Sequence, residues 1–228
     1  MEYEIKGGSF PMVVCKLQKG ETMKDESGAM AYMTSDVKMD TNTGGGLLKG
    51  LGRALSGDSI FLNFFTAEAD NAEIGFASHC PGKIIPIRLD GTNSIIGQKS
   101  SFLAAEESVE IDMYFRKKLG AGLFGGEGFV LQKFSGNGIA FLEIDGEAIE
   151  YDLQPGEKLL IDQGHIAAMD ESVDFDIERV KGAKNLLFGG EGLFLATLKG
   201  PGRVWIQTMP IAKLAEAIIP FIPTNNEQ

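Results

Sequence analysis

A chain of 228 residues with 43% hydrophobic and 23% charged residues has the composition of a soluble globular protein that can bury a core. Its formal net charge of −11 argues against general affinity for nucleic-acid phosphates or anionic membranes, because both attract basic surfaces. Thirty glycines, dispersed between apolar runs, predict many tight turns between short strands.

The N-terminal segment MEYEIKGGSFPMVVCKL (1–17) has no basic region followed by a long apolar core, so we expect no secretory signal. No apolar stretch approaches the roughly 20 residues that span a bilayer. The two cysteines, Cys15 and Cys80, lie in different segments and exclude a disulfide framework. We therefore expect a reduced, cytoplasmic protein.

Residues 1–82 are predicted to form a first β-module that carries a glycine-rich insertion at 41–57. Within it, GLLKGLGRALSG (46–57) places four leucines near one helical face, although its internal glycines make a poor helix. We interpret this stretch as a surface excursion docked on its own module. The alternative is a small basic contact with a membrane or a partner, which would need more than two cations to hold a membrane.

Residues 83–146 are predicted to form a second β-module built of short strands. KIIPIRL (83–89) leads into a turn, and SFLAAEESVEIDMYF (101–115) alternates polar and apolar positions as a half-buried strand does. GFVLQKF (128–134) and IAFLEI (139–144) flank a Gly-Asn-Gly turn and are predicted to form a hairpin. Strands this short and frequent indicate an antiparallel β-sandwich or barrel.

Residues 147–210 repeat the second module. At a shift of 64, the segment 89–143 lies over 153–207 without a gap, and 16 of the 55 pairs are identical. The hexapeptide LFGGEG occurs in both copies, at 123–128 and 187–192. A shift of 136 aligns LQKGE of the first module with LQPGE of the third. The chain is therefore predicted to hold three related modules, which must share edges because each is too small to cover its own hydrophobic faces.

Residues 211–228 are predicted to form a short C-terminal helix and a tail. IAKLAEAIIPFIP (211–223) has an apolar helical spacing that Pro220 interrupts, because proline cannot continue a helix. We expect this helix to pack on the modules or on a sister subunit.

LQKGETMKDESGAMAYMTSDVKM (17–39), the glycine-rich insertion, SFLAAEESVEI (101–111) and the repeated GGEG together resemble the family of bacterial and mitochondrial proteins named for altered inheritance of mitochondria. The resemblance covers nearly the whole chain. It implies an all-β fold of three tandem β-sandwich or double-stranded β-helix modules, each similar to the subunit of the tryptophan RNA-binding attenuation protein. It also implies a homotrimer whose nine modules imitate the ring of that protein.

The same resemblance says little about activity. Mitochondrial relatives are linked to inner-membrane organisation, whereas bacterial members lack an established activity, and we expect no transit peptide in this chain. Nucleic-acid binding finds little support, because Lys133 becomes Thr197 in the third module and Phe64 in the first. A ring that binds the phosphates of an RNA backbone needs basic side chains in every module. The negative net charge of the chain disfavours RNA binding further.

The chain offers few side chains for catalysis. His79 and His165 are its only histidines and do not occupy equivalent repeat positions, and no zinc-ligand spacing surrounds either. His79 beside Cys80 suggests a thiolate pair, but neighbouring strand residues point to opposite faces, so we interpret the two as an ordinary loop pair. Ser108 and Ser172 lack the G-x-S-x-G turn of a hydrolase nucleophile, and no phosphate-binding glycine loop is present.

Three carboxylates, Asp58, Glu127 and Glu191, occupy the same position in the three modules. They would surround a cation such as Ca²⁺ if the modules converged on one axis, since Ca²⁺ takes oxygen ligands. The alternative is a glycine turn whose acidic residue faces water or accepts bonds from nearby backbone N–H groups. We favour the turn, and we expect no metal and no cofactor.

These observations predict a non-catalytic binding or scaffolding protein that acts as a ring-like oligomer of identical chains. Another protein or a membrane-associated complex is a possible further partner. The alternative is an enzyme or a small-ligand-binding protein whose site lies in a cleft between modules, where polar side chains with shifted pKa values would converge. RNA binding ranks third.

Overall fold

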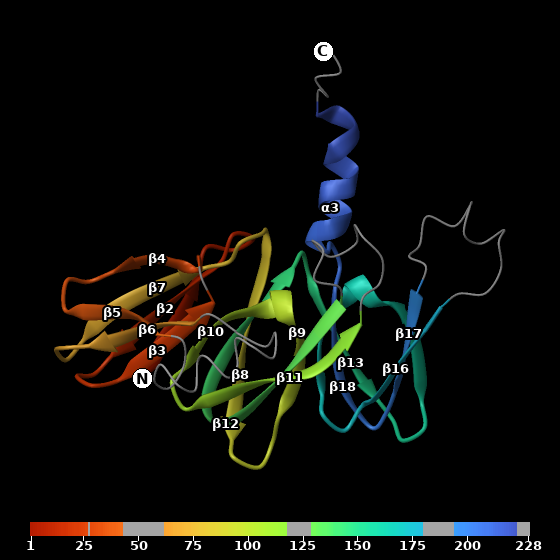
Figure 1. Ribbon diagram of the computed structural model, residues 1–228, viewed down its shortest axis with the longest axis horizontal. Coiled ribbons are helices and arrows are strands. Elements are labelled where there is room, and N and C mark those ends of the chain that lie inside the picture. The colour runs from red at the N-terminus through yellow and green to blue at the C-terminus, as the bar shows by residue number, and fades with distance from the viewer. Residues whose placement is uncertain (27, 43–61, 118–128, 180–193, 223–228) are drawn as a thin grey trace.

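The computed structural model describes residues 1–26, 28–42, 62–117, 129–179 and 194–222 (Figure 1). These residues are mostly antiparallel strands, followed by one short α-helix near the C-terminus. The structure thus confirms the all-β fold class and the C-terminal helix that the sequence predicts. Strands from the first part of the chain lie at one end of the molecule in Figure 1, and strands from the last part lie at the other.

The described strands form four antiparallel layers, of which the middle two share one long strand. The first layer contains β1 (Glu2–Lys6), β2 (Met12–Leu17), β7 (Ala72–Ala77) and β4 (Met30–Met33), in that order. The second contains β8 (Gly82–Asp90), β12 (Phe129–Asp145), β10 (Phe102–Glu106), β3 (Thr22–Glu26), β6 (Leu62–Ala67) and β5 (Val37–Asn42). The third contains β13 (Ala148–Leu153), β18 (Gly202–Gln207), β15 (Ile166–Asp170), β9 (Ile95–Gln98), β12 again and β11 (Val109–Lys117). The fourth contains β14 (Lys158–Asp162), β17 (Phe194–Lys199) and β16 (Asp174–Arg179).

The predicted hairpin in the second module is wrong. Residues 129–145 form the single strand β12, whose first half pairs with β9 and β11 and whose second half pairs with β8 and β10. The two halves therefore lie in different layers and do not pair with each other. Gly136 has a φ of 95°, and a Cβ at this position would lie 2.5 Å from the carbonyl oxygen of Ser108. Glycine is required there because another backbone approaches closely, and not because the chain reverses.

The strand pairings repeat along the chain. With the strands of each module counted one to six in chain order, the sixth pairs with the first and third, and the fifth pairs with the second and fourth. The six strands are β2 to β7, then β8 to β11 with the two halves of β12, then β13 to β18. The third strand also carries a β-bulge at the same step in every copy. The domain limits 1–82, 83–146 and 147–210 themselves stay a prediction.

Successive copies are joined edge to edge. The third strand of the second copy, β10, pairs with the second strand of the first, β3. The same rule joins β15 to β9 one copy later. We call these contacts the 1–2 junction and the 2–3 junction. Each junction extends a three-strand half-sheet of one copy into a half-sheet of its neighbour.

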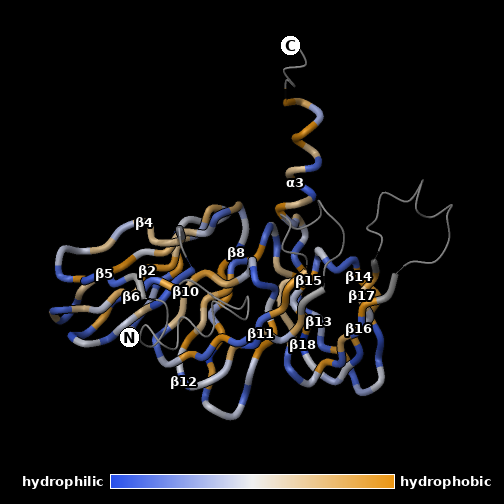
Figure 2. The backbone as a smooth tube through the Cα atoms, in the orientation of Figure 1, coloured by the Kyte–Doolittle hydropathy of each residue, from blue (hydrophilic) through white to orange (hydrophobic). Residues whose placement is uncertain are grey.

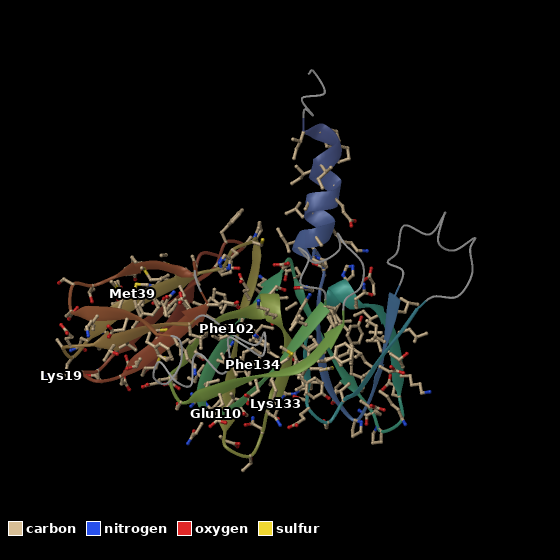
Figure 3. All side chains as sticks on the ribbon, in the orientation of Figure 1. Lys19, Met39, Phe102, Glu110, Lys133 and Phe134 are labelled. Atoms are coloured by element: carbon tan, nitrogen blue, oxygen red, sulfur yellow. The ribbon has the colours of Figure 1, made fainter. Side chains whose placement is uncertain are left out.

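The hydrophobic cores lie between successive layers and are shared across the junctions. In β2, Val13, Cys15 and Leu17 are fully buried, whereas Lys16 is exposed, as expected for a strand with one face on a core. The core around them also contains Phe141 from the second half of β12. In the next core, the rings of Phe102 and Phe134 pack with centroids 5.6 Å apart (Figure 3), alongside Trp205 from β18. In Figure 2, apolar residues (orange) lie along the strands, and α3 carries them as well.

The C-terminal helix α3 (Ile211–Ile218) extends away from the layers and continues as a single 3₁₀ turn, η3 (Ile219–Phe221) (Figure 1). Two further 3₁₀ turns, η1 (Lys99–Ser101) and η2 (Gln163–His165), precede β10 and β15. The Ile211 N–H donates to Asp145 Oδ2 at 2.8 Å, and Lys213 pairs with Asp162 at 3.0 Å. No residue of α3 is buried, so these polar contacts hold only its first turn.

Candidate functional site: the strand edges that join modules

The sequence-predicted carboxylates cannot be placed. Asp58, Glu127 and Glu191, both copies of LFGGEG and the 46–57 stretch all lie outside the described residues. Within the described ranges, no group of three or more His, Cys, Asp and Glu side chains is arranged to hold a metal ion. The structure therefore directs attention to other features.

The interpretation of Glu127 and Glu191 as turn residues remains testable. Changing both to Gln is expected to lower the free energy of unfolding by about 1 kcal/mol or less per site, with no metal dependence, as for surface substitutions. Thermal melts of both proteins with Ca²⁺ and with EDTA measure this. A shift of several degrees on chelation in the parent protein, absent from the double variant, would show that these residues bind an ion.

The two internal junctions share one register. At the 1–2 junction, Ala104 faces Asp25 and Ala105 faces Lys24. At the 2–3 junction, the equivalent residues pair in the same way: Ala168 faces Gly97, and Met169 faces Ile96. Each of these eight positions is buried. Inside a single chain, the same edge-to-edge contact is thus made twice with different side chains.

Two strands carry the same edges without a partner among the described residues. β4 is the third strand of the first copy and ends the first layer, and β14 is the second strand of the third copy and ends the fourth layer. They lie at opposite ends of the molecule (Figure 2). Leu160 of β14 is 66% exposed, whereas its equivalent Ile96 is 1% exposed. Tyr32 of β4 is 37% exposed, whereas its equivalent Ala104 is fully buried.

The exposed edges differ from the other sheet edges of the molecule. β5, β11 and β16 are the fourth strands of their copies, and each pairs on one side only, with the fifth strand of its own copy. This edge occurs in all three copies, and no described strand pairs with it in any of them. β4 and β14 are exposed only because the chain contains no described strand to pair with them, and each presents unpaired backbone N–H and C=O groups.

A polar cluster lies at the 1–2 junction. Glu143 of β12 accepts hydrogen bonds at 2.8 Å from the Ser78 hydroxyl and the His79 backbone N–H. Its other oxygen lies 2.7 Å from Nδ1 of His79, a ring that is half-exposed while the carboxylate is buried. The hydrogen bond with Glu143 raises the pKa of His79 above its ordinary value, although partial burial opposes this. His79 and Cys80 both lie in the linker between β7 and β8.

Asp25 of β3 belongs to the same cluster. The residue is fully buried, its Oδ1 accepts a bond from Asn63 at 3.0 Å, and its Oδ2 has no partner. Burial raises the pKa of Asp25 to about 6, although hydrogen bonds from the Asn63 side chain and the Met30 backbone, and then the charge of His79, oppose that rise. Burial disfavours the charged form, so this carboxyl keeps its proton to a higher pH than an exposed aspartate does.

His165 occupies a different environment at the 2–3 junction. Its Nδ1 lies 2.7 Å from the backbone carbonyl of Gln207, and the Gln207 amide donates to the Gln98 side chain and the Gly164 carbonyl. The structure thus does not bring His79 and His165 together. Cys15 lies in the first core, where burial raises its pKa to about 12, and both cysteines are free thiols.

From the sequence, fused modules that share edges are expected to leave an open strand edge at each end of the chain, but that expectation did not name the strands, and the acidic cluster was missed. The sequence contains one signal for each feature. In β14, Leu159 and Leu160 align with Met23 and Lys24 of the first copy, and Leu160 is therefore apolar where the first copy has a lysine. In β12, Glu143 aligns with the uncharged Gln207 of the repeat, and this substitution indicates the acidic cluster. Neither signal says which residues meet in space.

The fold and its edges define an all-β protein of fused, edge-paired repeats. The chain belongs to the mitochondrial biogenesis AIM24 family, whose family model matches residues 3–209. An uncharacterized protein of Streptococcus pyogenes serotype M6 is 29% identical over 226 residues, 95% of this chain and 89% of the relative. The crystal structure of protein SPYM3_0169 from Streptococcus pyogenes shares the fold, with a TM-score of 0.79 at 24% identity over 97% of this chain and 99% of its own.

These findings confirm the family that the sequence resembles. The likeness of each copy to the subunit of the tryptophan RNA-binding attenuation protein stays a prediction. In the part of the chain that the structure describes, no helix is long and apolar enough to cross a membrane.

Proposed function

We propose that this chain is a non-catalytic scaffolding protein that assembles head to tail into a closed ring, a homotrimer, through β4 of one chain and β14 of the next. The observation that supports this most is the repeated junction. The chain already joins a third strand to a preceding second strand twice in one register, and it exposes one unused strand of each kind.

The internal junctions specify the register of the proposed contact. By equivalence with Ala104–Asp25 and Ala168–Gly97, Tyr32 of one chain would face Ile161 of the next. Met33 would then face Leu160, and the fourth layer of one chain would join the first layer of the next in a seven-stranded sheet, in which β1 is the strand that the second and third layers lack. Two different strand edges pair in this contact, so it is heterologous, and such contacts close into rings when the rotation per chain allows.

Burial favours the same contact. Leu160 would pass from 66% exposed to the environment in which Ile96 is 1% exposed. Fully burying a leucine side chain stabilises by about 1.5–3 kcal/mol, and pairing the backbone removes an edge that otherwise invites aggregation. The number of chains follows from the predicted likeness to the tryptophan RNA-binding attenuation protein, whose ring nine fused modules would imitate.

The alternative is a small-ligand or catalytic site at the 1–2 junction. The supporting observation is the His79–Glu143 pair, in which a carboxylate orients a half-exposed imidazole. A carboxylate of this kind orients the catalytic imidazole of hydrolases. We rank this alternative second, because among the described residues no hydroxyl or thiol is bonded to the His79 ring, and the Ser78 hydroxyl donates to Glu143 instead.

Light scattering on the purified protein tests the proposal. We expect a particle of about three times the 24.5 kDa chain mass. Leu160→Asp should reduce the mass to that of one chain, because it places a carboxylate where the equivalent junction residues are Ile96 and Lys24, so neither internal junction holds an acid at this position. Met39→Asp is the matched control, since Met39 is exposed on β5, an edge that no internal junction uses. A parent protein of 24.5 kDa at dilute concentration would contradict the ring.

A further inference from the structure

Three positions that carry carboxylates at the 1–2 junction carry uncharged residues at the 2–3 junction. Equivalent positions carry Asp25 and Gly97, Glu26 and Gln98, and Glu143 and Gln207. At the 2–3 junction, the neutral amide of Gln207 donates hydrogen bonds to the Gln98 side chain and to the Gly164 carbonyl. The two junctions share one backbone pairing, and both carry an acid at one further equivalent position, Glu106 and Asp170. The three carboxylates named above, and the buried Lys24 that stands where the 2–3 junction has Ile96, are therefore what distinguishes the 1–2 junction.

His79 connects the two sides of this junction. Its Nδ1 is bonded to Glu143 on β12, in the second copy. Its Nε2 lies against Gly28 in the turn between β3 and β4 of the first copy, where an added Cβ would be 3.6 Å away. The imidazole therefore bridges a buried carboxylate of one copy and the backbone of the other.

We propose that the 1–2 junction is a proton-operated latch, closed while His79 and Asp25 are protonated beside Glu143 and loosened when His79 and Asp25 lose their protons. This inference goes beyond ring assembly and applies to a single chain. Loosening would free β3 from β10 while leaving β9 paired with β15.

The carboxylates that face His79 all favour its protonated form. Its electrostatic neighbours are the carboxylates Glu143, Asp25 and Glu26, and Asp145 lies close enough to interact with both Glu143 and His79. Lys99 pairs with Glu26 at 3.5 Å and offsets one of these charges. When His79 becomes neutral, the remaining carboxylates repel one another in a partly buried site.

The sign of the pH dependence follows from two raised pKa values. The pKa of Asp25 rises from 3.8 to about 6 in the folded chain, so its stabilising contribution is lost as the pH rises through about 6. The pKa of His79 is raised above 6.5, so its contribution is complete below 6.5 and is lost above its folded value. Burial raises the pKa of Asp145 in the same sense. The junction is therefore strongest in mild acid and weaker at pH 8.

Hydrogen exchange at pH 5.5 and pH 8.0, corrected for intrinsic rates, tests the latch. The ratio of protection in β3 to protection in β9 is expected to fall at least several-fold between these values, since one unit of pKa shift corresponds to a tenfold change in an equilibrium constant. The 2–3 junction serves as an internal reference, because its equivalent positions are uncharged.

Two variants complete the experiment. Glu143→Gln recreates the amide of the 2–3 junction and is expected to remove the part of the pH dependence at β3 that comes from His79, because the hydrogen bond with Glu143 is the main cause of the raised His79 pKa. The part that comes from Asp25 should remain, because burial causes it. His165→Gln is the matched control and should leave that dependence unchanged, since His165 bonds a backbone carbonyl and no carboxylate. An equal fall in protection at both junctions of the parent protein would overturn the latch, as would a Glu143→Gln protein that keeps the full pH dependence.

Discussion

Phe141→Ala is expected to lower the free energy of unfolding by about 3–5 kcal/mol, the cost of replacing a buried phenylalanine by alanine. Phe141 is fully buried, and its ring packs edge-on against Tyr3 at a centroid distance of 5.0 Å. The strand that carries it belongs to the second copy, yet the side chain fills the core of the first. Because a domain is stabilised by only about 5–15 kcal/mol in total, this loss should be severe.

The same variant reports whether the copies fold as one unit. Since the core is shared, Phe141→Ala should move one cooperative thermal transition downward by about 6–20 °C, taking about 2–4 °C per kcal/mol for a chain of this size. Phe10→Ala is the matched control and should change the midpoint little, because Phe10 is 73% exposed. A melt that separates into two transitions, only one of them shifted, would contradict a shared core.

The repeat in the sequence predicted much of the fold because equivalent residues take equivalent pairings. The shift of 64 that aligns Glu107 with Glu171 also carries the pairs of β11 with β12, as far as Met113–Gln132, onto those of β16 with β17. Beyond Met113 a bulge in β11, which β16 lacks, ends this equivalence. The hairpin prediction was wrong because alternation of apolar residues identifies only a strand. It does not say whether two successive strand segments pair with each other or form one continuous strand. A Gly-Asn-Gly string serves equally well as a turn and as a point of close backbone approach.

The candidate site was less predictable for a related reason. Leu160 is apolar in a run of apolar residues, and only its pairing partner decides whether it is core or surface. His79 and Glu143 are 64 residues apart in sequence, and neither lies in a motif. Contacts that depend on which edge meets which strand come from the assembled layers, so local sequence cannot supply them.

A disulfide across the proposed chain-to-chain junction is expected to form only in the correct register. Opposite residues of an antiparallel pair have Cβ atoms about 4.5–5.5 Å apart, close to the 3.5–4.5 Å that a disulfide needs. In a Cys80→Ser background, Met33→Cys combined with Leu160→Cys should therefore link chains under mild oxidation. Cys15 should not react, because burial raises its pKa to about 12 and suppresses the thiolate.

The pattern of products separates a ring from other assemblies. A closed trimer of heterologous contacts should give linked pairs first and then one dominant three-chain species, whereas an open filament would give a ladder without an end. Thr34→Cys with Leu160→Cys is the matched control, because it shifts the pair by one residue and turns one thiol to the opposite face. Equal cross-linking in both double variants would exclude the proposed register. A link within a single chain would exclude head-to-tail assembly altogether, since β4 and β14 would then have met without a partner.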